Sequence, residues 1–168
     1  LNTIEYRKNF KFILNIYQKL DPKIQEKFPL IIFGMKGRYS DKILNEINNV
    51  KNCKYYGYLD ENFFNQCLSS AKILFYPSVY EGFGISPLES MASGTPVVAS
   101  KIDVTREILK DNALLSNLDD EKEWIDNIMK LIDDEDTYNK IVQKGIYHSN
   151  YFKKGNTVNK ILDVYKNI

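Results

Sequence analysis

Residues that commonly bind metals or form disulfides are scarce in this chain. It has two cysteines and one histidine in 168 residues. Cys53 and Cys67 are not arranged as C-x-x-C, so the sequence favours neither a zinc site nor a disulfide framework. We expect no bound metal, both cysteines in the core, and His148 at the surface or at a helix end.

Three further absences limit the classes of protein that this sequence fits. No stretch approaches the roughly 20 uninterrupted apolar residues that cross a bilayer, and the first residues lack the apolar segment of a signal peptide. Lys and Arg number 23 against 22 Asp and Glu, so no net charge attracts nucleic acid or a membrane surface. These features predict a cytoplasmic chain without a nucleic-acid partner.

The residues that are plentiful are those that build a core. Hydrophobic residues make up 43% of the chain and aromatic residues 13%. A length of 168 residues is close to that of one average domain. No internal repeat or low-complexity linker divides the sequence. We therefore predict a single domain over residues 1–168.

Short apolar runs alternate with helical patterns over the first two thirds of the chain. The runs are apolar on both parities, as in strands covered on both faces, and the segments between them have helical spacing. Strands that alternate with helices form parallel sheets, since parallel neighbours need a crossover. The fold class predicted is α/β, a Rossmann-like parallel sheet flanked by helices. The strands are expected at 29–34, 53–58, 72–76, 95–100 and 113–116, and the helices at 9–20, 40–49, 61–70, 87–93 and 103–110.

The last third of the chain has helical patterns only. Apolar stripes over 124–132, 138–145 and 158–165 predict three helices that pack together and close the domain. The acidic segment Asp-Glu-Asp at 134–136 has the spacing of a metal-binding Asp-x-Asp motif. Because it lies between two amphipathic helices, we interpret it as a solvated loop.

A glycine-rich turn after the strand at 72–76 is the most informative segment. The helix that follows is predicted to have Ser86 at its N-cap and Pro87 at N1. Gly82 and Gly84 let the backbone come close to a ligand. A helix start at the carboxyl end of a parallel strand is where open α/β sheets bind ligands, and its N–H groups favour a phosphate. The turn is therefore a candidate anion site.

Two carboxylates, Glu81 and Glu89, flank this turn. Ser86 and Glu89 have the spacing of a capping box, in which Glu89 only accepts a hydrogen bond from the Ser86 backbone N–H. On spacing alone that interpretation is favoured. Glu81 has no comparable local role in its loop. If both carboxylates face one ligand, the vicinal hydroxyls of a sugar or ribose are suitable partners, because they donate in pairs.

The segment around these carboxylates also resembles a known signature. Residues 81–98 read EGFGISPLESMASGTPVV, which is similar to the E-x7-E signature of the family-4 retaining glycosyltransferases. The resemblance is specific at 76–98 and extends over nearly the whole chain. Weaker matches are Arg7-Lys8-Asn9 with the family's basic motif, 31–34 with a strand-glycine turn, Tyr56-Gly57-Tyr58-Leu59 with its base-contacting loop, and Pro77-Ser78 just before the signature.

The resemblance implies the C-terminal, donor-binding half of a GT-B enzyme, in which two Rossmann-like domains face each other across a cleft. It implies a hexosyltransferase that transfers a sugar, with retention and without a metal or other cofactor, from a UDP-sugar or GDP-sugar to an acceptor glycan or lipid-linked saccharide. An N-terminal domain absent from this chain would hold the acceptor, so the isolated chain would be inactive or weakly active. A bacterial polysaccharide-biosynthesis enzyme would fit, cytoplasmic and, at full length, associated with the inner face of the membrane.

Roles for particular residues follow from the same resemblance. Glu81 would contact the sugar hydroxyls, and Lys8 with Arg7 would neutralise the diphosphate; we assign these three as catalytic. The family often has an Arg several residues before the Lys, whereas residues 2–6 contain none, which leaves Arg7 as the candidate. Glu89 would hold the ribose hydroxyls. The donor-binding positions implied are Glu89, Gly82, Phe83, Gly84, Ile85, Ser86, Gly34, Tyr58 and Leu59.

Other functions on a similar fold remain open at this point. The chain could be a non-catalytic nucleotide-binding or partner-docking module, or it could catalyse another GT-B reaction such as epimerisation or phosphorolysis. A dinucleotide-binding domain is disfavoured, because only Gly34-x-x-Gly37 follows a strand and G-x-G-x-x-G is absent. Arg106 and Glu107 could reach a cleft, although a surface ion pair is the simpler interpretation.

Overall fold

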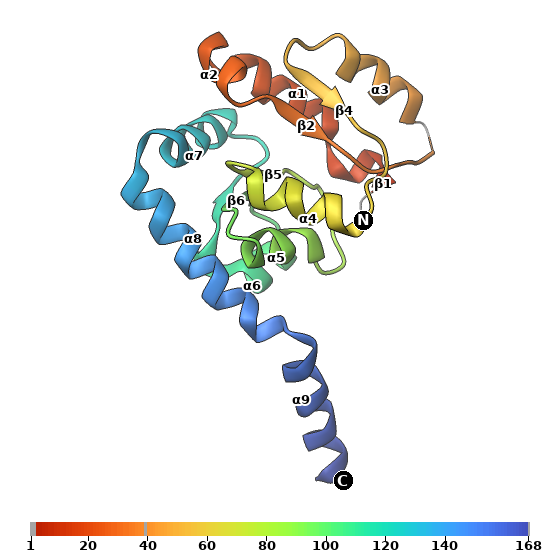
Figure 1. The fold of residues 1–168 in the computed structure, drawn as a ribbon, viewed down its shortest axis with the longest axis vertical. Helices are drawn as coiled ribbons and strands as arrows, with labels where there is room; N and C mark the ends of the chain where they lie inside the picture. The colour runs from red at the N-terminus through yellow and green to blue at the C-terminus, as the bar shows by residue number, and fades with distance from the viewer. Residues whose placement is uncertain (1–2, 39, 168) are drawn as a thin grey trace.

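Parallel strands and helices alternate along the chain, which confirms the predicted fold class (Figure 1). The structure is a computed structural model that describes residues 3–38 and 40–167. Its strands pair in parallel as β1 with β3, β2 with β4, and β5 with β6 and β7. The strands are β1 (Thr3–Ile4), β2 (Leu30–Ile32), β3 (Met35–Lys36), β4 (Cys53–Tyr55), β5 (Leu74–Tyr76), β6 (Val97–Ser100) and β7 (Leu114–Ser116).

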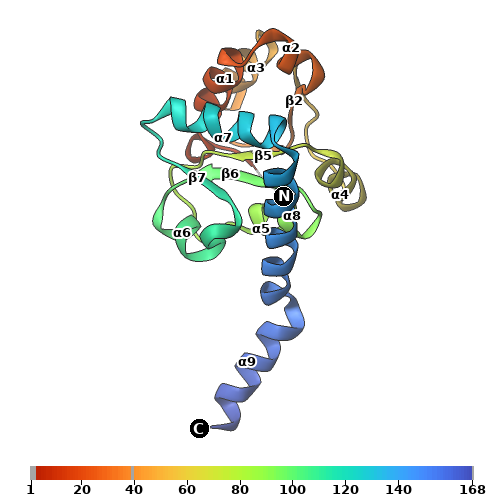
Figure 2. The ribbon, with the colours of Figure 1, turned by 90° about the vertical axis from the view of Figure 1, so that its left-hand side faces the viewer.

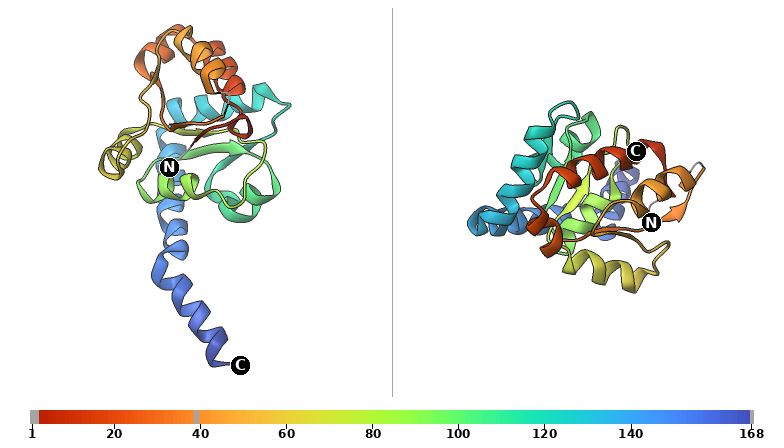
Figure 3. Two further views of the ribbon diagram at one scale, coloured as in Figure 1. Left: turned by 90° about the vertical axis from the view of Figure 1, so that its right-hand side faces the viewer. Right: turned by 90° about the horizontal axis from the view of Figure 1, so that it is seen from above.

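Helices surround these strands (Figures 2 and 3). Helix α7 contacts both α1 and β6, and α5 contacts β5, β6 and α8. The helices are α1 (Phe10–Lys19), α2 (Pro22–Lys27), α3 (Ser40–Asn48), α4 (Glu61–Ser70), α5 (Ile85–Ala92), α6 (Asp103–Leu109), α7 (Glu121–Asp133), α8 (Glu135–Ser149) and α9 (Lys154–Lys166). Short 3₁₀ turns are found at η1 (Tyr6–Lys8), η2 (Lys110–Asn112) and η3 (Asn150–Phe152).

The strands are shorter and less evenly covered than the sequence predicts. All four residues of β6 are buried, as expected of a strand covered on both faces. In β2, however, Ile31 is exposed, and both residues of β3 are exposed. The strand expected to reach residue 58 ends at Tyr55, and Gly57 has a left-handed φ of 70°. Helix α2 and strand β3 were not anticipated, because each is too short to show a periodic pattern.

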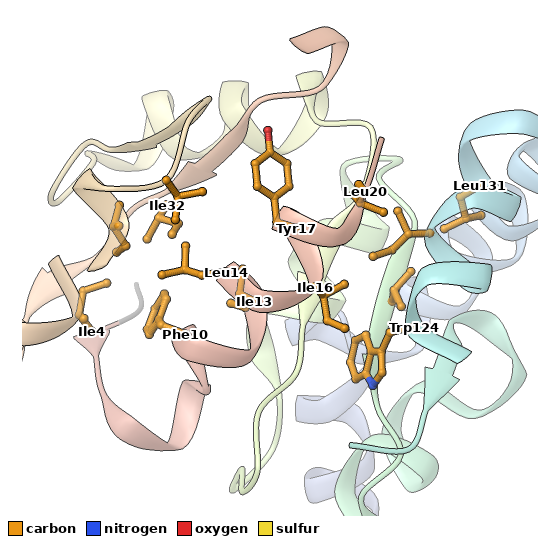
Figure 4. Close-up of a cluster of buried hydrophobic side chains, with 14 of the residues drawn as sticks. Ile4, Phe10, Ile13, Leu14, Ile16, Tyr17, Leu20, Ile32, Trp124 and Leu131 are labelled. Atoms are coloured by element: carbon orange, nitrogen blue, oxygen red, sulfur yellow. The ribbon is translucent and has the colours of Figure 1, made fainter. Parts of the chain in front are cut away.

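The larger hydrophobic core joins α1 to the strands and to α7 (Figure 4). Trp124 of α7 is fully buried and lies beside the rings of Phe12 and Phe75, with centroids 5.4 and 5.1 Å away. Its Nε1–H donates a 2.8 Å hydrogen bond to the backbone O of Asn117. This satisfied polar atom lets the whole indole remain inside.

Trp124 is expected to contribute most to stability among single core positions. Trp124→Ala removes the ring from between α1 and β5 and should lower the free energy of unfolding by about 3–5 kcal/mol. Tyr165→Ala is a matched control, because the Tyr165 side chain is 73% exposed. The stability of both variants is measured by urea denaturation with circular dichroism as the signal. Tryptophan fluorescence is unsuitable, because Trp124→Ala lacks the chain's only tryptophan. Equal effects of the two substitutions would contradict this role.

The two cysteines lie less deep than expected. Cys53 and Cys67 are both half-buried and unpaired by a disulfide. Cys53 packs against the larger core from β4, and burial raises the pKa of its thiol to about 11. The raised pKa keeps the thiol protonated near neutral pH, so it behaves as a small apolar side chain.

The prediction that three C-terminal helices close the domain is wrong for the third. Helix α8 lies close to α5, because Gly145 has no Cβ; one added there would be 3.1 Å from Cγ of Met91. Helix α9 instead projects away from the body (Figures 1 and 2). Val158 and Leu162 of its apolar stripe are exposed. An amphipathic pattern predicts a helix but does not identify what the helix packs against.

Candidate functional site

A pocket of about 640 Å³ opens where the segments after β1, β4 and β5 come together. Its volume lies in the range of small-molecule and cofactor sites. Most of the residues that line it follow the carboxyl ends of parallel strands, the usual ligand site of such sheets. They are Arg7, Lys8, Tyr58, Glu61, Phe64, Asn65, Tyr76, Glu81, Phe83, Gly84, Ile85, Ser86 and Glu89.

The start of α5 differs from the predicted capping arrangement. The helix begins at Ile85, and Gly84 occupies the N-cap position with a left-handed φ of 91° that glycine adopts readily. Ser86 therefore lies inside the first turn, where Pro87 is still tolerated. No side chain hydrogen-bonds as an N-cap of α5. The capping-box interpretation of Ser86 and Glu89 is wrong.

Glu81 is held by both basic residues of η1. Its Oε1 accepts a 2.5 Å hydrogen bond from Lys8 Nζ, and its Oε2 accepts one of 2.6 Å from Arg7 Nη1. The Glu81 and Lys8 side chains are 6% and 8% exposed, whereas Arg7 is 39% exposed and also pairs with Glu5. Glu81 therefore has a structural role through residues distant in the sequence: it neutralises two cations, one of them buried.

The electrostatics of this cluster follow from its burial. Burial alone would raise the pKa of Glu81, but hydrogen bonds from Lys8 and Tyr76 outweigh it and lower that pKa. Burial lowers the pKa of Lys8, and the ion pair with Glu81 offsets this only in part. The carboxylate is thus firmly ionised, while the ammonium group needs its acceptors to stay charged.

Tyr76 supplies one of those acceptors and was not identified from the sequence as a site residue. Its hydroxyl accepts a 3.0 Å hydrogen bond from Lys8 Nζ, and Nζ lies 4.8 Å from the centre of its ring. Burial raises the pKa of Tyr76, which keeps the hydroxyl neutral. The sequence feature that could have identified it is a tyrosine, whose hydroxyl can form hydrogen bonds, at the last position of β5 directly before the glycine-rich turn.

Glu89 extends from α5 into the same pocket. Its Oε2 atom is buried and has no hydrogen-bond partner among the residues that the structure describes. Burying a carboxylate oxygen without a partner is unfavourable by roughly 1–3 kcal/mol or more. An acceptor left in this state inside a pocket is suited to a ligand that brings its own donors.

Apolar and aromatic groups complete the pocket. Phe83 is 46% exposed and lies edge-on to Phe152, with ring centroids 6.0 Å apart. Ile85 and Tyr58 are also largely exposed while lining the pocket. The pocket therefore combines three carboxylates, two cations and open apolar surfaces.

Some residues expected at the donor do not line this pocket. Gly82, Gly34 and Leu59 are absent from its lining. The backbone of Gly34 is already paired: its N–H donates to Gly57 O at 2.7 Å, and its O accepts from Tyr55 Oη at 2.7 Å. Their donor contacts stay predictions. Three lining residues from α4, namely Glu61, Phe64 and Asn65, were not anticipated, because an amphipathic helix gives no signal for which polar residues border a cavity.

The remaining sequence candidates lie elsewhere. Asp134 caps α8 by accepting a 2.9 Å hydrogen bond from the Thr137 N–H, so the acidic segment is a helix start and not a loop. Arg106 and Glu107 are exposed and do not line the pocket. His148 lies at the end of α8 as expected, but it is buried, with Nε2 2.6 Å from Ile108 O.

Neither a metal cluster nor a membrane-spanning helix is found in the described ranges 3–38 and 40–167. No group of three or more His, Cys, Asp or Glu side chains there is arranged to hold a metal ion. No helix in that part of the chain has both the length and the apolar character needed to traverse a bilayer.

Comparison with known proteins gives the site a family context. Residues 1–147 match the family described as glycosyl transferases group 1. O-antigen chain mannosyltransferase B of Escherichia coli is 27% identical over 169 residues, which cover 99% of this chain and 44% of that protein. O-antigen chain mannosyltransferase RfbU of Salmonella typhimurium is 46% identical over 93 residues, or 52% of this chain and 26% of that protein.

Solved structures show the same fold. Anabaena HepE in complex with UDP and glucose superposes with a TM-score of 0.86 at 18% identity, covering 100% of this chain and 47% of that one. WaaG, a glycosyltransferase involved in lipopolysaccharide biosynthesis, has a TM-score of 0.72 at 14% identity over 86% of this chain and 40% of its own. This chain spans less than half the length of these relatives. It belongs to the glycosyl transferases of group 1 and has the fold of the C-terminal half of a GT-B glycosyltransferase.

Proposed function

We propose that the pocket binds a nucleoside-diphosphate sugar, a UDP-sugar or a GDP-sugar, as the donor of a hexosyl transfer. The observation that carries the proposal is the convergence of Glu81, Glu89, the Lys8 and Arg7 cations and the start of α5 on one cavity. A diphosphate needs the cations and the helix start, and a ribose and a sugar need acceptors for their hydroxyls. These requirements occur together in a nucleotide sugar.

The positive part of the pocket suits the leaving group. As the bond from the anomeric carbon to oxygen breaks, negative charge develops on the departing diphosphate. Lys8, Arg7 and the backbone N–H groups at the start of α5 would stabilise that charge. Preorganised donors of this kind contribute on the order of 3–4 kcal/mol each. The proposed reaction therefore requires no metal.

Glu81 is better suited to orient a hydroxyl than to attack carbon. Both of its oxygens are engaged by cations, and the same contacts lower its pKa and its nucleophilicity. We assign it to the sugar hydroxyls of the donor, and we assign Glu89, with its unpaired buried oxygen, to the ribose hydroxyls. Retention of configuration is part of the proposal and is supported by the family alone.

The setting of the reaction follows from the relatives. Their names describe O-antigen mannosyltransferases, which supports a sugar acceptor such as a glycan or lipid-linked saccharide. We propose that a separate domain holds this acceptor, that the full-length enzyme works in the cytoplasm at the membrane surface, and that residues 1–168 form its donor-binding domain. The isolated chain would then bind donor and transfer little or none of it, as a pure binding module would.

Lys8→Ala tests the diphosphate assignment. The variant should bind UDP or GDP about tenfold to a hundredfold more weakly, because a charge-assisted contact contributes roughly 1.5–3 kcal/mol. Affinity for the matching nucleoside should stay unchanged. Isothermal calorimetry measures both, with Lys11→Ala as the control, since Lys11 lies three residues away and is 60% exposed. If nucleoside and diphosphate lose affinity equally, Lys8 does not contact the diphosphate.

A further inference from the structure

The wall of the pocket formed by α4 carries two polar side chains that the proposed reaction does not use. Glu61 is the first residue of α4, and Asn65 follows one turn later, so both lie on the same face of the helix. Both line the pocket, together with the ring of Tyr58 from the segment just before α4. In the described part of the chain, neither the Glu61 nor the Asn65 side chain has a hydrogen-bond or ion-pair partner.

The start of α4 does not need the Glu61 carboxylate for capping. Asp60 is the N-cap, and its Oδ1 accepts a 2.9 Å hydrogen bond from the Phe63 N–H. A carboxylate in the first turn adds a modest interaction with the helix dipole, and any position in that turn would provide it. Its place at the edge of the pocket is therefore available for a ligand.

The chemistry of these groups distinguishes between bases. An ionised carboxylate only accepts hydrogen bonds and pairs best with two adjacent donors. Guanine presents such a pair, N1–H and the N2 amino group, with the acceptor O6 beside them for an amide donor such as that of Asn65. Uracil presents one donor, N3–H, between two carbonyl oxygens that a carboxylate repels. Stacking on Tyr58 would favour any base, since every base has a π-face.

We propose that Glu61 makes this pocket selective for a guanosine diphosphate sugar over a uridine diphosphate sugar, by accepting hydrogen bonds from guanine N1–H and N2–H. Asn65 assists by donating to O6, and Tyr58 supplies a stacking surface. The inference rests on the proposed donor function and narrows its substrate class. Bidentate pairing of this type discriminates between bases by about tenfold to a hundredfold.

Calorimetry on this chain with GDP, UDP and inosine diphosphate tests the assignment. GDP should bind at least about tenfold more tightly than UDP. Inosine diphosphate, which lacks only the N2 amino group, should fall between them. In Glu61→Gln the advantage of GDP over inosine diphosphate should disappear and UDP affinity should stay level or rise. Glu107→Gln on α6, outside the pocket, is the matched control.

The possible outcomes separate this inference from the proposed function. Equal binding of GDP and UDP, a preference for UDP, or a preference for GDP that survives Glu61→Gln would overturn the role of Glu61 and leave a nucleotide site intact. Failure of every nucleoside diphosphate to bind the folded wild-type chain would overturn the proposed function and the base assignment with it. Circular dichroism melting establishes that each variant is folded, and Asp60 still caps α4 in Glu61→Gln.

Discussion

Glu81→Gln is expected to tighten the binding of a nucleoside diphosphate while it destabilises the ligand-free protein. The substitution removes the negative charge that Lys8 and Arg7 share, so both cations face an incoming diphosphate without a competing carboxylate. Leaving the buried Lys8 ammonium group without the Glu81 counter-charge should lower the free energy of unfolding by about 3 kcal/mol. A bound diphosphate supplies a new counter-charge for Lys8, so the affinity for the diphosphate rises further. Calorimetry with GDP and UDP and urea denaturation measure the two effects.

Glu5→Gln is the matched control for this prediction. Glu5 also pairs with Arg7, at 2.7 Å, but it is 39% exposed and does not line the pocket. Its loss should change stability by less than about 1 kcal/mol, as for other exposed pairs. Weaker diphosphate binding in Glu81→Gln would show that Glu81 does not compete for the cations. The nucleotide sugar should gain less affinity than the diphosphate alone, because Glu81 also accepts from the sugar.

The same ion pair predicts the response of the wild-type fold to acid. Because the folded-state pKa of Glu81 lies below its ordinary value of 4.5, its contribution to stability is complete above that value. The contribution is lost as pH falls through the lowered pKa. Glu81→Gln should lack this part of the acid dependence, so the difference in stability between the two proteins should shrink below about pH 4.

Glu89→Ala is expected to weaken ligand binding without lowering stability, the reverse of the effects expected for Glu81→Gln. Glu89 Oε2 is buried and has no partner in the part of the chain that the structure describes, so removing this carboxylate should leave the ligand-free chain as stable as the wild type or slightly more stable. Binding of a ribonucleoside diphosphate should weaken about tenfold to a hundredfold, because hydrogen bonds from ribose hydroxyls to a charged acceptor are lost. Thermal melting and calorimetry on the same preparation test both halves.

A dideoxy ligand provides the control for Glu89. A 2′,3′-dideoxynucleoside diphosphate has no ribose hydroxyls, so it should bind the wild type weakly and Glu89→Ala about equally. If Glu89→Ala weakens the dideoxy and ribose ligands by the same factor, the carboxylate does not bind the ribose. A marked loss of stability without ligand would show instead that Glu89 is a structural residue.

The sequence was most informative about the segment that carries the two carboxylates of the candidate site. Glu81 and Glu89 were identified as a pair because they flank a glycine-rich turn, and both line one pocket. The same local signals predicted that α5 begins at Pro87, two residues after its observed start at Ile85. A left-handed glycine, Gly84, can take the N-cap position without a side-chain acceptor, and the serine pattern gave no indication of this choice.

Contacts between distant segments could not be predicted in the same way. Tyr76 and Lys8 are 68 residues apart, and their hydrogen bond exists only because the turn after β1 packs against the end of β5. A backbone hydrogen bond of 2.8 Å from the Val79 N–H to Arg7 O joins the same two segments. Periodicity and spacing describe one segment at a time, so they do not record such pairings.

The residues alone were enough to predict the alternation of strands and helices, the parallel pairing, and the motif that carries the carboxylates. These follow from side-chain periodicity and from local backbone preferences, which act over a few residues. Only the packed chain reveals that Glu81 neutralises Lys8 and Arg7, that Glu89 Oε2 is buried with no partner among the described residues, and that α9 projects from the body. Each of these depends on burial and on the meeting of distant segments, which only the packed chain defines.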